Sequence, residues 1–418
     1  MTSPSLARRL GTPDAVVIGL GAMVGAGVFA AFAPAAEVAG PGLLIGLAIA
    51  GGVAYCNAVA SAQLAAQYPV SGGTYYYGRQ RLGEWWGFTA GWGFVIGKTA
   101  SCGAMALTFA TYAVDGPEWV RRLVALAAVV LLVAVNYRGV TKTAAVTRVL
   151  VAATLLVLLL VVVLALLGDG TTTDHVTDLG SASAYDVLQA AGLLFFAFAG
   201  YARIATLGEE VREPETAIPR AIVVALTVAT VVYLVVGVSA LLAAGADVLA
   251  DAPAPLAATV EAAGAAWAQP IVRVGAAAAS LGSLLVLIAG IGRTALAMAR
   301  NGDLPRWLDA VHRRHRTPHH AELVVGVVVG ALVLTTDLRG VLAFSSFGVL
   351  TYYAIANASA YTQDSDHRRW PRVFNVVGVV GCAVLAVTLP WQGVVSGVVV
   401  LAVGLAGRAA LQRNSHHG

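Results

Sequence analysis

The stretch Val17-Ile-Gly-Leu-Gly-Ala-Met-Val-Gly-Ala-Gly-Val-Phe29 decides how the rest of the chain is interpreted. Four glycines, Gly19, Gly21, Gly25 and Gly27, interrupt an otherwise apolar segment. A glycine inside a helix costs about 1 kcal/mol relative to alanine, so the closely spaced second pair indicates a place where a helix unwinds. Backbone freed at membrane depth is tolerated only where it is buried in protein or lines a cavity. The stretch therefore predicts a helix break that a polar solute can occupy, with close helix packing through small residues as the alternative.

The composition of the chain is that of a membrane protein. Of its 418 residues, 58% are hydrophobic and only 11% are charged, and the mean hydropathy is +0.79. A soluble domain of this length does not show such values. The net charge of +4 does not indicate a nucleic-acid partner, because the basic residues are dispersed at the ends of apolar segments. We expect an all-α polytopic protein in a lipid bilayer.

Twelve apolar stretches are long enough to be considered as membrane spans, which need about 20 residues each. The predicted spans are 14–37, 41–66, 85–113, 121–136, 143–168, 185–208, 219–245, 271–299, 321–336, 340–361, 373–390 and 392–411. Residues 1–13 and 412–418 are predicted to be tails, 14–361 the core of ten spans, and 362–411 two additional spans.

The basic residues predict the orientation of these spans. With a cytoplasmic N-terminus, nineteen of the 26 basic residues fall on the inner side, against four, Arg121, Arg122, Arg273 and Arg339, on the outer side. Lysine and arginine concentrate in cytoplasmic loops. We therefore expect both termini in the cytoplasm and the protein in the cytoplasmic (inner) membrane. The turn-rich segments 169–178 and 245–269 are expected to be external connectors.

Motifs in the first three spans resemble the amino acid, polyamine and organocation (APC) superfamily. The stretch Gly21-Ala-Met-Val-Gly-Ala-Gly-Val-Phe29 is similar to its first-helix signature. Tyr68-Pro-Val-Ser-Gly-Gly-Thr-Tyr-Tyr-Tyr77 is similar to its Pro-x-x-Gly-Gly-x-Tyr loop, and Gly87-Phe-Thr-Ala-Gly-Trp92 to the Gly-Phe-x-x-Gly-Trp start of its third helix. We interpret the tyrosines themselves as an aromatic belt at the membrane interface.

The sixth span resembles the second broken helix of the same superfamily. Leu193-Leu-Phe-Phe-Ala-Phe-Ala-Gly-Tyr-Ala-Arg203 leads into Glu209-Glu-Val-Arg-Glu-Pro214, but Ala202 stands where an acid is common and Glu213 replaces an asparagine. Gly292 to Pro305 is similar to the end of the eighth helix, where we expect Arg293 to be structural. The resemblance implies a LeuT-like fold, with spans 1–5 and 6–10 as inverted repeats, two C-terminal helices, and helices 1 and 6 unwound mid-membrane.

The resemblance also implies an amino acid site at the two breaks. Free amides and the positive helix end after the first break suit a carboxylate, and we predict the amides of Gly25, Ala26 and Gly27 for this role. The carbonyls implied as partners of the substrate ammonium belong to Ala22, Met23, Phe198 and Ala199. Other candidate substrate-binding residues are Lys98, Phe196, Tyr201, Ala202, Arg203 and Ser283, of which Phe196 and Tyr201 are candidate gating aromatics.

These patterns predict a permease, a secondary active transporter that moves amino acids by alternating access. Lys98 and Arg203 lie inside spans, and no acid lies in the interior of the first, third, sixth, eighth or tenth span. Ionisable residues at membrane depth are functional by default, so we expect neutral or acidic amino acids to be favoured over cationic ones. The alternatives are a polyamine or cationic amino acid exchanger of the same superfamily and a transporter-like amino acid sensor.

We predict no cofactor, no metal and no catalytic residue. The loop from His312 to His320 has no cysteine or acid at ligand spacing, and a membrane enzyme would need a cluster of His, Asp, Glu or Ser on converging spans, which we do not find. Thr154 stands where sodium-independent members of the superfamily use a lysine. The sequence therefore leaves open a coupling proton, sodium coupling or exchange.

Overall fold

The computed structural model describes residues 10–70, 72–139, 144–208, 210–315 and 317–415. Most of the predicted tails, together with Ser71 and Glu209 of the two motifs, therefore lie outside the described residues. The described part of the chain is almost entirely helical, without a β-strand; an isolated bridge joins Leu10 to Val211. Nine of its helical segments are long and apolar enough to cross a membrane, and two shorter apolar helices accompany them.

The helices have the following bounds. The first half of the chain forms α1 Thr12–Met23, α2 Gly27–Ala30, α3 Phe32–Ala39, α4 Leu43–Gln67, α5 Gly73–Leu82, α6 Glu84–Ala113, α7 Glu118–Tyr137 and α8 Ala144–Leu167. The second half forms α9 Ala184–Phe198, α10 Ala202–Ala205, α11 Pro214–Asp251, α12 Pro255–Ala262, α13 Gln269–Arg300, α14 His319–Thr335, α15 Leu338–Tyr361, α16 Arg372–Thr388 and α17 Trp391–Ser415.

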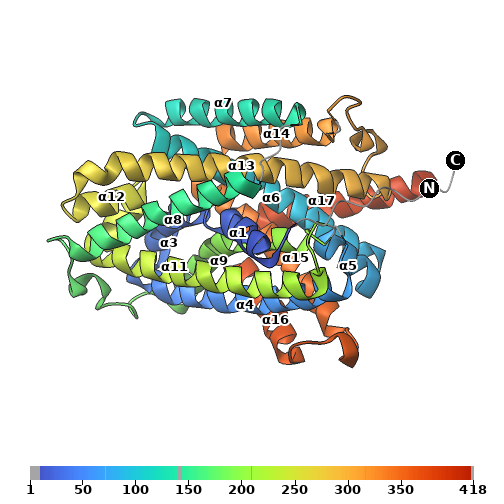
Figure 1. The fold of residues 1–418 in the computed structure, drawn as a ribbon, viewed down its shortest axis with the longest axis horizontal. Coiled ribbons are helices and arrows are strands. Elements are labelled where there is room, and N and C mark those ends of the chain that lie inside the picture. The colour runs from blue at the N-terminus through green and yellow to red at the C-terminus, as the bar shows by residue number, and fades with distance from the viewer. Residues whose placement is uncertain (1–9, 71, 140–143, 209, 316, 416–418) are drawn as a thin grey trace.

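The broken helix α1 lies at the centre of the molecule (Figure 1). It packs against α8, α11 and the short turn that joins α9 to α10. The helices α7 and α14 run side by side along one edge (Figure 1). Large apolar side chains such as Leu131, Leu156, Val327 and Val403 are exposed. A surface this apolar suits lipid, and the prediction of a polytopic helical membrane protein is confirmed at this level. The twelve-span, LeuT-like arrangement stays a prediction.

The two predicted breaks differ in form. The first helix stops at Met23 and restarts at Gly27. In the sixth span, α9 ends at Phe198 and a single 3-10 turn, Ala199–Tyr201, leads directly into α10. Phe198 and Tyr201 keep right-handed helical φ and ψ angles. The second element is therefore tightened rather than unwound, and this part of the prediction is wrong.

Two segments that we expected to be simple connectors contain helices. Helix α11 continues to Asp251 across a kink at Gly245, whose φ of 74° is in the left-handed region that favours glycine. Helix α12 follows, with Leu256 and Val260 buried against its neighbours. The expected aromatic belt is instead part of α5, in which Tyr75 and Tyr77 are buried. Alanine-rich sequence outweighed the turn signals in α12, and burial of the tyrosine face did so in α5.

Candidate functional site

A cavity of about 660 Å³ lies between α1, α6, α8, α10 and α13. Seven of the predicted substrate-binding residues line it: Ala22, Gly25, Lys98, Ala199, Ala202, Arg203 and Ser283. Thr154, which the resemblance to the superfamily predicts to take the place of a lysine, is also on its wall. The cavity therefore brings together residues from five distant parts of the chain, at the end of α1, in α6, in α8, in the turn that leads into α10, and in α13.

The other predicted residues lie behind this wall, as far as the described residues define it: Met23, Ala26, Gly27, Phe196, Phe198 and Tyr201. The ring of Phe198 contacts Tyr233 edge-on, with centroids 5.1 Å apart. The ring of Tyr201 stacks on Tyr353 at 4.9 Å. The rings of Phe198 and Tyr201 are therefore packed against other helices in this conformation. A gating role for Phe196 and Tyr201 stays a prediction.

The interruption after α1 leaves backbone donors free. The amide of Val24 still donates to the carbonyl of Leu20 at 2.7 Å, and helical bonding resumes when Phe29 and Ala30 donate to Ala26. Within the described chain, no backbone acceptor is found for the amides of residues 25 to 28. Free amides of this kind are suited to a carboxylate or phosphate.

Glycines allow the two interrupted segments to touch. A Cβ added at Gly27 would lie 2.6 Å from Cα of Ala197, and one at Gly200 would overlap the backbone of Ala22. A Cβ at Gly25 would overlap the hydroxyl of Ser283. The glycines therefore serve close packing as well as the break, and the alternative of small-residue packing applies to the same positions.

Lys98 connects α6 to the turn after α9. Its Nζ donates to the carbonyl of Ala199 at 2.9 Å, and the hydroxyl of Tyr353 donates to the same oxygen at 3.3 Å. Only 7% of Lys98 is exposed. One of the carbonyls expected to bind the substrate ammonium is therefore bonded to an ammonium of the protein itself.

Three further charged side chains line the cavity, Arg203, Arg293 and Glu210. Arg203 donates to the hydroxyl of Thr206 at 3.0 Å. Among the described residues, neither of these arginines nor Lys98 has an ion pair with a carboxylate. We predict a structural role for Arg293 from the sequence, whereas the structure places it on the cavity wall. Glu210 is not among the predicted site residues, although the Glu-Glu pair after the sixth span is a sequence signal for an acid near the site.

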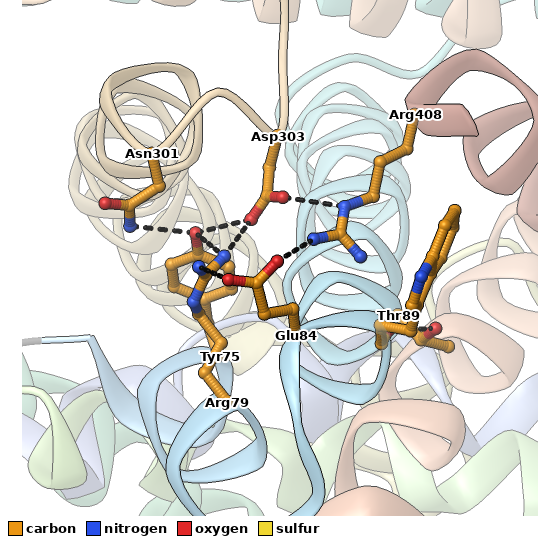
Figure 2. A network of polar contacts seen from close by, with 8 residues as sticks. Tyr75, Arg79, Glu84, Thr89, Asn301, Asp303 and Arg408 are labelled. Atoms are coloured by element: carbon orange, nitrogen blue, oxygen red, sulfur yellow. Dashed lines mark hydrogen bonds and ion pairs between the residues drawn. The ribbon is translucent and has the colours of Figure 1, made fainter. Parts of the chain in front are cut away.

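A largely buried polar network adjoins the cavity at Tyr75 (Figure 2). Tyr75, a cavity-lining residue, donates its hydroxyl to Asp303 at 2.7 Å and accepts from the amide of Asn301. Burial, and secondarily its bond to Asp303, raises the pKa of Tyr75 to about 12. The phenol therefore stays protonated at neutral pH and keeps donating.

Two arginines complete this network from opposite sides (Figure 2). Arg79 of α5 and Arg408 of α17 each bond one oxygen of Asp303 at 2.8 Å. Glu84 contacts both arginines, at 3.2 and 3.4 Å, and the guanidinium of Arg408 lies 4.4 Å from the ring of Trp85. In the sequence Arg408 was only one of the basic residues that set the orientation; no local pattern indicated its partner.

The helical spans and the partly polar cavity are those of a membrane protein with room for a small solute. The model of the amino acid permease family matches residues 10–407, and the chain belongs to this family. The resemblance to the APC superfamily is thereby confirmed, and membership indicates a transporter rather than an enzyme.

Several known proteins are similar along the chain. An uncharacterized transporter of Mycobacterium bovis is 58% identical over 402 residues, which cover 96% of this chain and 90% of the relative. The branched-chain amino acid permease BcaP of Bacillus subtilis is 27% identical over 430 residues, covering 96% and 92%. The cationic amino acid transporter 6, chloroplastic, of Arabidopsis thaliana is 27% identical over 235 residues, covering 55% and 40%.

Proposed function

We propose that this amino acid permease is a secondary active transporter of the cytoplasmic membrane that works by alternating access. The observation that carries the proposal is the cavity between the interrupted first helix and the turn at Ala199. Interrupted helices in corresponding positions of two repeats are where secondary transporters bind their substrates. The amides at Gly25, Ala26 and Gly27 are the proposed carboxylate site, of which Gly25 lines the described cavity wall.

The proposed substrates are neutral or acidic amino acids rather than cationic ones. The described cavity wall carries three basic residues, Lys98, Arg203 and Arg293, and one acidic residue, Glu210. A cavity with this excess of positive charge repels a cation. The alternative is a cationic amino acid or polyamine exchanger; the Arabidopsis relative is named a cationic amino acid transporter, which favours the cationic substrate of that alternative. The charge balance of this cavity opposes it.

The coupling ion is proposed to be a proton or absent. A hydroxyl, Thr154, stands on the cavity wall where relatives use a lysine, and it is already bonded to the carbonyl of Leu150 at 2.8 Å. A sensor on the same fold is the alternative of another class. It would bind an amino acid without moving it across the bilayer.

Uptake into proteoliposomes tests the transport function. Purified protein is reconstituted and supplied with labelled leucine, glutamate or arginine, with and without inward proton and sodium gradients. We expect saturable uptake of leucine or glutamate and weak uptake of arginine. Binding without uptake would favour the sensor, and arginine as the best substrate would favour the cationic exchanger.

A further inference from the structure

The ammonium of Lys98 is buried at the cavity wall with an incomplete set of partners. Of its three N–H donors, one bonds the carbonyl of Ala199, and no carboxylate among the described residues is within ion-pair distance. Burying an ammonium without a counter-ion costs free energy, and binding of an anion beside it lowers that cost. The cavity supplies none near it, so a bound ligand is the available source.

The acceptor that Lys98 uses has no room for another donor. A carbonyl oxygen has two lone pairs, and that of Ala199 already accepts from Lys98 and from Tyr353. A substrate ammonium approaching this oxygen would displace one of them and meet the positive charge of Lys98. The carbonyl therefore does not favour a second cation in this conformation.

The remaining charges of the cavity also favour an anionic ligand. Arg203 and Arg293 add two cations on its wall, and Glu210 adds one anion. A zwitterion with no net charge leaves this excess uncompensated. A ligand with two carboxylates and one ammonium places one carboxylate at the free amide of Gly25, which lines the described cavity wall, and has a second for Lys98.

From this arrangement we infer that Lys98 is a specificity-determining residue that selects acidic amino acids, by pairing with their side-chain carboxylate. The inference deepens the proposed function and rests on it, because it concerns the same cavity. It goes further in excluding neutral amino acids as the preferred substrates.

Equilibrium binding to the purified protein tests the inference, with competition between labelled glutamate and unlabelled leucine, lysine or glutarate. Glutarate carries two carboxylates and no ammonium, so it isolates the contribution of the second carboxylate. The variant Lys98→Met removes the charge with little change in volume. The matched control is Arg306→Met, which removes a charge from an exposed residue outside the cavity.

We expect the parent to bind glutamate at least about tenfold more tightly than leucine, because a charge-assisted hydrogen bond is worth this much. Glutarate should compete better than leucine. Lys98→Met should abolish the preference for glutamate over leucine, since the partner of the second carboxylate is lost. Arg306→Met should bind like the parent.

Tighter binding of leucine than of glutamate by the parent would overturn the inference, as would an equal loss of both ligands in Lys98→Met. The ranking in the parent decides the matter even if the variant does not fold. A parent that is folded but binds none of these ligands would contradict the proposed amino acid function itself, which is a different failure.

Discussion

At the residue scale, the glycines of the two interrupted segments do more than loosen a helix. Gly27 approaches Ala197 and Gly200 approaches Ala22, so each glycine allows one segment to contact the backbone of the other. The sequence predicted the first break from glycine spacing. It could not predict which backbone each glycine faces, because that contact joins residues far apart in the chain.

Replacing Gly200 by alanine should destabilise the protein by about 1–3 kcal/mol, because the new methyl group would overlap rigid backbone. The control is Gly52→Ala in α4, where an added Cβ meets nothing within 4 Å and helix propensity improves by about 1 kcal/mol. Melting temperatures in detergent compare the two. Equal stability of both variants would mean that the segments do not cross as described.

At the scale of elements, the network around Asp303 fixes α17 to α5 and α6. The side chains of Asp303 and Arg408 are 2% and 1% exposed, whereas Glu84 is 64% exposed. Helix α17 is otherwise apolar and little buried. Only the folded arrangement brings these three residues together, so no local sequence pattern predicts the network.

Removing the charge of Asp303 should therefore be far more damaging than removing that of Glu84. Asp303→Asn removes the buried counter-ion of the Arg408 guanidinium and leaves it the exposed carboxylate of Glu84, an effect of about 3–5 kcal/mol. Glu84→Gln should cost about 0–1 kcal/mol, since the lost carboxylate is exposed to solvent. Thermal unfolding followed by thiol labelling of the buried cysteines measures both. Similar losses would contradict the buried pair.

At the scale of the whole molecule, hydropathy and motif order predicted the membrane class, the family and the approximate helices. Helix ends, α12 and the helix α5 were missed, because these depend on packing between segments. Seven of the thirteen predicted site residues line the cavity. The other six belong to the same two helical segments but do not line the described cavity wall, and a sequence motif does not show which side of a segment faces a cavity.

The predicted orientation can be tested with single cysteines, because the three native cysteines are buried. Thr173→Cys lies in the loop after α8 and Arg314→Cys in the loop before α14; both positions are exposed. In intact cells an impermeant thiol reagent should label the first variant and not the second, as the distribution of basic residues predicts. The reverse pattern would invert the topology.

The central claim is that an amino acid binds in the cavity beside the interrupted first helix. Ser283 is on the cavity wall, with its hydroxyl 3.2 Å from the carbonyl of Gly21, so Ser283→Cys places a thiol at the site. We predict that a small thiol reagent reacts with this variant about tenfold more slowly at a substrate concentration of ten times Kd, and that Thr173→Cys is unaffected. Unchanged labelling of Ser283→Cys, under conditions where the same preparation binds the amino acid, would place the substrate elsewhere and contradict the account.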